Sequence, residues 1–143
     1  MKQIFLLIST LLITVLAYSQ DVGDSTAVAN PGGEWIDNRL ADCLKAKDIT
    51  TVEQNDCLYT ALEQWEKQLS DTYSLVVSQV DEPAKSALKS SQTAWLSYKN
   101  GQFKFLEQYY GNMQGTMYKQ VMITEKIEVI KRRFAELYNL TQD

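Results

Sequence analysis

The feature that most constrains this chain is a long apolar seam in its middle. Apolar side chains recur at alternating steps of four and three over about three heptads, which places them on one face of an α-helix. Thr50 followed by Glu53 forms a capping-box pattern just before the seam and predicts where the helix begins. The seam consists of Leu58, Leu62, Trp65, Leu69, Tyr73, Val76 and Val80.

The rest of the chain after Gly33 also has helical periodicity, and Pro83 is the only later proline. A short helix is expected over about Glu34–Ala46, with an apolar side of Trp35, Ile36, Leu40, Cys43 and Leu44. A third helix begins near Pro83 and ends near Gly111, and its apolar side is expected to hold Leu88, Trp95, Tyr98, Phe105 or Leu106, and Tyr109. A fourth contains Ile123, Ile127, Ile130, Phe134 and Leu137. Because short turns join the long helices, we expect an all-α fold: an antiparallel bundle of three long helices plus a short N-terminal helix.

The N-terminus has the pattern of an export signal. Met1-Lys2 is followed by an apolar run over 4–16 and small residues before Gln20, so a signal peptide over 1–19 is expected. An uncleaved membrane anchor is the alternative, but the apolar core is short for a bilayer span. Residues 20–33 are small and polar and predict a flexible linker. The helical domain then covers 34–143, in a periplasmic or secreted protein with no stable membrane insertion after cleavage.

Charge and composition limit the function. Without Lys2, thirteen Lys and Arg stand against eighteen Asp and Glu, a net charge of −5. Nucleic acid is therefore an unfavourable partner, whereas a basic protein would be attracted. The chain has no histidine, no phosphate-binding glycine loop and no nucleophile motif, so we expect neither an enzyme nor a bound cofactor or metal.

The two cysteines, Cys43 and Cys57, both lie in the expected exported part. An isolated pair in an oxidising compartment most simply forms one disulfide, which would tie the short helix to the next. Two free buried thiols are the alternative.

A second feature lies in the third helix. Gln92, Trp95 and Tyr98 recur at steps of three, along one side of a helix. Because aromatic stripes at helical spacing are usually core, we expect packing with one or two side-chain hydrogen bonds, and a ligand site is the alternative.

These residues carry a family resemblance. The pattern of Leu88, Gln92, Trp95, Tyr98 and Lys99 resembles the signature helix of the LprI-type lysozyme inhibitor N-terminal domain, an exported bacterial family. The segments around Cys43, Cys57, Leu69, Tyr73 and Arg133–Leu137 also resemble that family. The family usually carries another cysteine at the position of Phe103, paired with one near Glu125, and this chain lacks both.

The resemblance implies a small binding protein that inhibits lysozyme through protein–protein contact. The alternative is an envelope structural or adaptor module without lysozyme activity. For an inhibitor, the most suitable recognition surface is the connection Gly111–Gly115 with its neighbouring tyrosines, although an ordinary helix connection is the other interpretation. Its candidate partner-binding residues are Tyr109, Tyr110, Asn112, Gln114 and Tyr118.

Overall fold

The structure is a computed structural model that describes residues 32–142. Four helices make up these residues: α1 (Glu34–Leu44), α2 (Thr51–Gln79), α3 (Glu82–Gly111) and α4 (Met117–Asn139). The all-α class is confirmed. None of the described helices combines the length and the hydropathy needed to cross a bilayer. The expected signal peptide lies outside the described residues.

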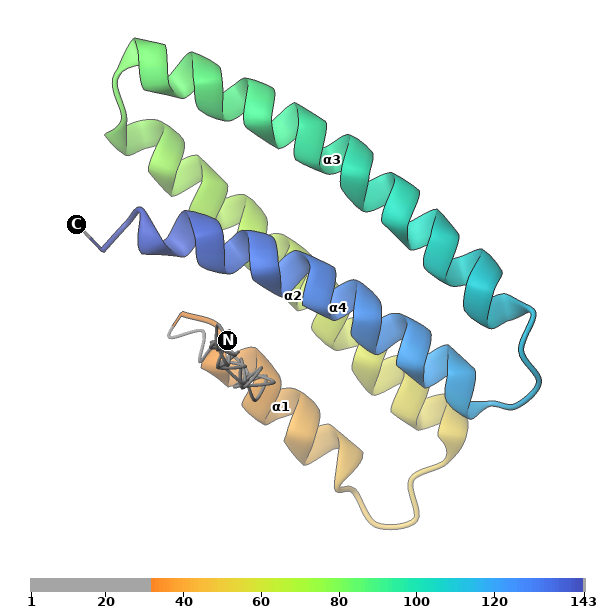
Figure 1. Ribbon diagram of the computed structural model, residues 1–143. Helices are drawn as coiled ribbons and strands as arrows, with labels where there is room; N and C mark the ends of the chain where they lie inside the picture. The colour runs from red at the N-terminus through yellow and green to blue at the C-terminus, as the bar shows by residue number, and fades with distance from the viewer. Residues whose placement is uncertain (1–31, 143) are drawn as a thin grey trace, which may run out of the picture.

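Side-chain contacts fix the direction of each helix. Trp65 of α2 packs against Phe134 of α4, and Gln54 bonds Gln120 of α4, so α2 and α4 run the same way. On α3, Glu107 pairs with Lys126 whereas Gln92 bonds Arg133 further along α4, so α3 runs opposite to α4. Figure 1 shows the chain reversing at each connection.

The core lies between α2 and α4. Its buried members come from α1, α2 and α4: Ile36, Leu58, Ala61, Leu62, Trp65, Leu69, Val76, Ile123, Ile127, Ile130, Phe134 and Leu137. The predicted seam of α2 is therefore correct, with Tyr73 and Val80 only partly buried at its upper end. On α1, by contrast, only Ile36 is buried, and Trp35 is 49% exposed.

Helix starts follow the local sequence. Thr50 caps α2 through its Oγ1, and its own amide donates to Glu53 Oε2 at 2.8 Å, which is the predicted capping box. The pKa of the Glu53 carboxyl is held below its usual value. The hydrogen bond from the backbone amide of Thr50 contributes most, and the hydrogen bond from the Thr50 hydroxyl contributes less. The next helix is capped by Asp81, which accepts from the amide of Ala84 at 2.9 Å, with Pro83 in the first turn as expected.

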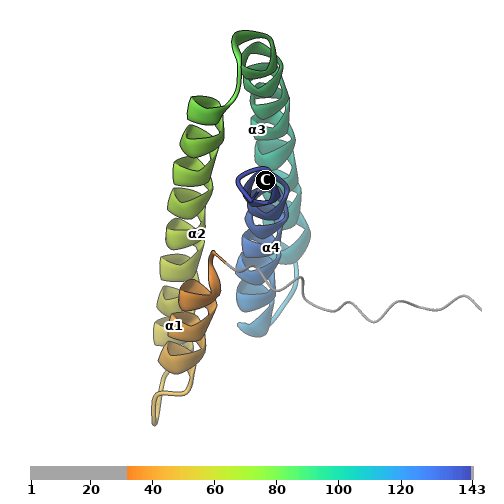
Figure 2. The ribbon, with the colours of Figure 1, turned by 90° about the vertical axis from the view of Figure 1, so that its left-hand side faces the viewer.

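The α1 helix is fastened along the lower half of α2 (Figure 2). Cys43 and Cys57 form a disulfide with Cα atoms 6.0 Å apart. Farther along the pair of helices, Trp65 Nε1 donates to Asp37 Oδ1 at 3.2 Å.

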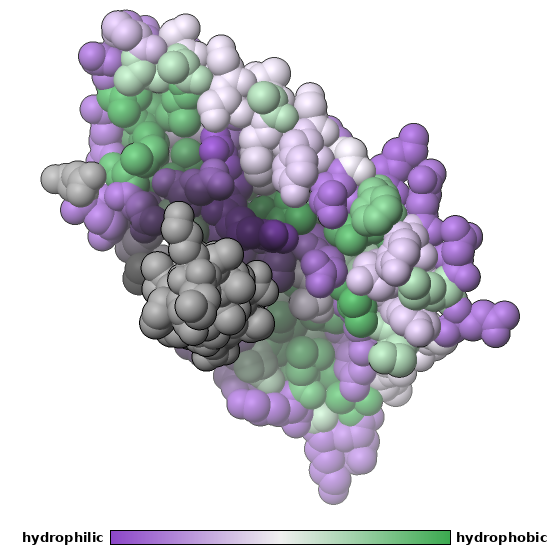
Figure 3. Space-filling model, in the orientation of Figure 1, coloured by the Kyte–Doolittle hydropathy of each residue, from purple (hydrophilic) through white to green (hydrophobic). Residues whose placement is uncertain are grey.

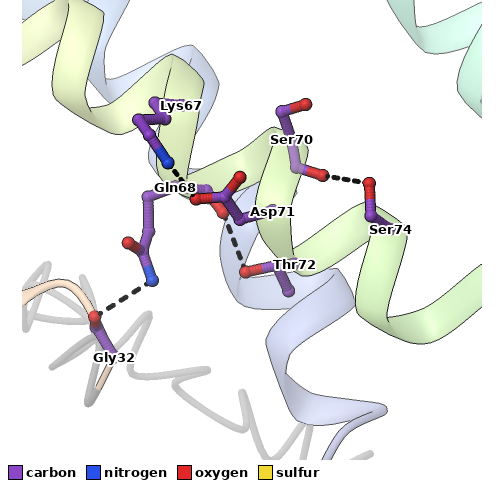
Figure 4. A network of polar contacts seen from close by, with 7 residues as sticks. All are labelled: Gly32, Lys67, Gln68, Ser70, Asp71, Thr72 and Ser74. Carbon is purple, nitrogen blue, oxygen red and sulfur yellow. Dashed lines mark hydrogen bonds and ion pairs between the residues drawn. The ribbon is translucent and has the colours of Figure 1, made fainter.

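The entry to α1 corrects one expectation. Residues 20–33 were expected to form a flexible linker, but Gly32 and Gly33 are packed against the bundle. Gln68 of α2 donates to the carbonyl of Gly32 at 3.3 Å (Figure 4). Gly33 is buried, and a Cβ there would meet the Trp65 ring at 1.9 Å. These glycines therefore serve close packing, while residues 20–31 of the expected linker lie outside the described part.

Candidate functional site

The third helix is the least buried element. Of its thirty residues only Leu106 is buried, because α3 packs along α4 and has few contacts with α2. Its inner seam follows steps of four or three through Leu88, Gln92, Trp95, Lys99, Phe103, Leu106 and Tyr110, all buried or half-buried.

This seam corrects the expected phase of α3. Tyr98 was expected on the inner side with Gln92 and Trp95, but it is 55% exposed. Successive steps of three drift by about 60° each on a helix, so two such steps carry Tyr98 off the inner face. Lys99 takes the inner position instead. Phe105 and Tyr109 likewise point outward, at 54% and 51% exposure, while Leu106 faces inward.

Polar contacts hold the signature residues. Trp95 and Leu88 pack against the edge of the core. Gln92 accepts from Arg133 Nε at 3.1 Å, and the same guanidinium bonds Ser91 and Glu136. One of the side-chain hydrogen bonds expected for this stripe is thus present at Gln92. The sequence did not predict that Arg133 would be the donor, nor that it would also bond Ser91 and Glu136.

Phe103 occupies the position at which the resembled family carries a cysteine. The ammonium groups of Lys99 and Lys126 lie 5.4 and 5.1 Å from its ring centroid. Lys126 is 6% exposed and pairs with Glu107 at 2.6 Å. Because Lys126 adjoins Glu125, this cation–π cluster joins α3 and α4 close to where the absent bridge would lie.

Hollows lie on two sides of α2 among the described residues. A hollow of about 520 Å³ lies beside the disulfide between α1 and α2, with Leu40, Ile49 and Ala61 among its lining residues. A hollow of about 380 Å³ lies between α2 and α3 and includes Trp95 and Gln92 in its lining. No group of three metal-ligating side chains occurs in the described part of the chain.

The predicted recognition surface is the tip formed by residues 109–118, at the α3–α4 connection (Figure 1). Gly115 has φ +120°, a conformation that favours glycine and turns the chain into α4. Gly111 has no such conformation, and a Cβ there would meet nothing within 4 Å. The backbone conformation therefore calls for glycine at position 115 and not at position 111.

A continuous series of rings stiffens the tip. Phe105 stacks on Tyr109 at 5.6 Å between centroids, Tyr109 meets Tyr110 edge-on at 5.0 Å, and Tyr110 stacks on Tyr118 at 6.4 Å. The last contact joins α3 to α4 across the connection. The structure thus brings the three predicted tyrosines together. Phe105, which the sequence predicted only as an alternative core residue, is an additional member of the series.

The amides of the tip are exposed. Asn112 Nδ2 donates to the carbonyl of Gln108 at 2.8 Å, which orients that side chain at the end of α3. Gln114 is exposed on the connection itself. The first turn of α4 is anchored to α2, because Lys119 lies 5.6 Å from the Tyr59 ring and Gln120 donates to Gln54 at 2.6 Å.

The tip also lacks negative charge. No Asp or Glu lies between Glu107 and Glu125, although the chain contains eighteen acidic residues. This run without acidic residues is visible in the sequence, and it makes the tip different in charge from the rest of an acidic protein. Amide and phenol groups without a neighbouring carboxylate can donate hydrogen bonds to acidic groups on another molecule.

Fold and surface together define a small, disulfide-tied helical protein with a stiff, uncharged tip. The sequence profile described as "Lysozyme inhibitor LprI" matches residues 43–137, and the chain belongs to this family. No curated protein matched the chain.

A crystal structure of an uncharacterized protein from Burkholderia thailandensis has a similar fold, with a TM-score of 0.68 and 24% sequence identity. The match covers 73% of the present chain and 52% of the other, so this chain spans about half the length of that protein.

Proposed function

We propose that this protein is an exported inhibitor that binds a lysozyme through its α3–α4 tip. Membership of the LprI family is the observation that carries the proposal. Export and lysozyme binding are part of what we propose for this chain.

The chemistry of the tip suits a glycosidase cleft. Lysozymes are glycoside hydrolases, and these enzymes place two carboxylates beside the glycosidic bond that they cleave. A plug that carried its own carboxylates would be repelled there, whereas Asn112 and Gln114 can donate hydrogen bonds to those groups. The ring series from Phe105 to Tyr118 would hold the amides in position at little entropic cost.

The overall charge supports association with a basic enzyme. The chain is acidic, with a net charge of −4, and its carboxylates lie away from the tip. Long-range attraction then accelerates the encounter, while the neutral tip enters the cleft. The association rate should fall as salt rises, with a smaller effect on dissociation.

The test replaces Asn112 and Gln114 together by alanine. Both side chains are exposed, so the melting temperature should change little, and inhibition of a basic lysozyme should weaken at least tenfold, about 1.4 kcal/mol.

A matched control replaces Gln79 and Asn139, which are exposed amides at the opposite end of the bundle. This control should inhibit like the parent. Full inhibition by a folded tip variant would contradict the tip assignment and would direct attention to the segment between Cys43 and Cys57.

A further inference from the structure

The outward face of α3 is unusually poor in charge. Among the exposed residues from Ser90 to Asn112, only Lys104 and Glu107 are charged, and Glu107 is paired with Lys126. In Figure 3 the visible side of α3, along the upper edge, is mostly pale and not saturated purple. Depletion of charge together with enrichment in aromatic residues is the composition of an interface core.

An aromatic stripe runs along this face. Tyr98, Phe105 and Tyr109 are each more than half exposed, and their spacing of seven and four places them on one side of the helix. With Ala94, Gly101 and Asn112 they form a face at steps of four, three, four, four and three. Lys104 lies to the side of this stripe, about 100° around the helix from Phe105.

Gly101 lies in the middle of the stripe and of the helix. Glycine inside a helix is less stable than alanine there. A Cβ at Gly101 would meet nothing within 4 Å, so no contact within the chain requires its absence. A missing side chain on an exposed face allows another backbone to approach closely.

We propose that a second copy of this chain packs on the stripe, with the two α3 helices antiparallel about a two-fold axis near Gly101. The stripe is self-complementary in this arrangement. Tyr98 lies opposite Phe105 of the second copy, and the small Ala94 lies opposite the large Tyr109. Such isologous contacts close into a dimer and expose no new edge. The stripe contains no charged residue, so its central contacts bring no like charges together.

The dimer is small and reversible. The stripe spans about 27 Å at 1.5 Å per residue, and one helix pair of this length lies at the lower end of interface sizes. Association is therefore expected in about the micromolar range. Each tip lies about 15 Å from the axis, and the two tips point to opposite ends, so Gln114 stays accessible in the dimer. Tyr109 and Asn112 belong both to the tip and to the outer end of the stripe.

The test is sedimentation velocity of the chain from Gln20 onward, at concentrations from about 1 to 500 µM, a range that brackets a micromolar dissociation constant. The parent should shift from monomer to dimer. Phe105→Glu and Gly101→Ala should each raise the dissociation constant at least tenfold. Gly101→Ala should also raise the melting temperature of the dilute monomer, which distinguishes it from a folding defect.

Leu75→Glu is the control, because Leu75 is also exposed but lies on α2, away from the stripe. It should dimerise like the parent. A parent that stays monomeric throughout, or a dimer unaffected by both stripe variants, would overturn the proposal. If the parent is monomeric and Gly101→Ala, which lies outside the tip, loses lysozyme inhibition, the stripe belongs to the lysozyme interface and not to a second copy.

Discussion

Replacing Gly33 by alanine tests the packing of α1 against the bundle. A Cβ at Gly33 would lie 1.9, 2.4 and 2.8 Å from three atoms of the Trp65 ring. Ordinary carbon contacts are about 3.5–4.0 Å, so the ring or the backbone must move by about 1.6 Å or more.

Neither partner can move freely. The Trp65 ring is fully buried, bonded to Asp37, edge-on to Phe134 at 5.3 Å and covered by Lys131 at 5.2 Å. Moving the backbone instead would break the hydrogen bond from Gln68 to the carbonyl of Gly32.

Overpacking in a core commonly costs about 1–3 kcal/mol, and a rigid ring on a fixed backbone places this variant near 3 kcal/mol. At roughly 4 °C per kcal/mol for a domain of about 110 residues, the melting temperature should fall by about 12 °C.

Thermal unfolding followed by circular dichroism provides the measurement. Gly111→Ala is the control, since a Cβ there meets nothing within 4 Å, and it should melt close to the parent. A Gly33→Ala variant that melts within a few degrees of the parent would refute the close packing of the entry to α1 against Trp65.

Three other predictions concern stability. Asn55 is 8% exposed and its Oδ1 has no hydrogen-bond partner, so Asn55→Leu should raise the free energy of unfolding by about 1 kcal/mol in urea titrations; a lower value would mean that the amide has a partner. Reduction of the Cys43–Cys57 disulfide should lower the free energy of unfolding by about 3 kcal/mol. Labelling of both thiols in the unreduced protein would show that the disulfide is absent. Because the pKa of Glu53 is lowered in the folded state, its carboxylate stabilises the fold at neutral pH, and this stabilisation is lost as the pH falls through that pKa. Glu53→Gln should still cap α2 but should not lose stability in this way at low pH. Identical acid titrations of parent and variant would exclude a contribution of Glu53 to the pH dependence.

Much of the fold follows from the periodicity of α2. Leu58, Trp65, Leu69 and Val76 recur on a single face, and the capping box at Thr50 marks the start of the helix. One apolar face and one start signal fix which side of α2 is turned toward the core, so the predicted seam was correct.

The side of α3 that faces the bundle could not be predicted from hydrophobic periodicity. Its inner positions include Gln92 and Lys99, whose polar groups find partners on α4 and α2, while aromatic rings occupy the outer face. Long side chains can cover apolar surface and still place their polar ends in hydrogen bonds. Hydrophobicity alone therefore assigned Tyr98 to the wrong side.

Contacts between distant segments explain the other differences. Gly32 and Gly33 have the composition of a flexible linker, and only the ring of Trp65 on another helix shows why they must be small. At the tip, the composition around Tyr109, Asn112 and Gln114 predicts a recognition surface, and this stays a prediction. The stacking of Tyr110 on Tyr118 depends on how α3 and α4 meet, which local sequence does not specify.

Lysozyme inhibition is tested most directly by the activity of a basic lysozyme on cell-wall substrate, titrated with the purified chain from Gln20 onward. We expect saturable inhibition that reaches its limit at one tip per enzyme molecule and weakens with added salt. Full lysozyme activity at a large molar excess of the folded protein, across several basic lysozymes, would contradict it.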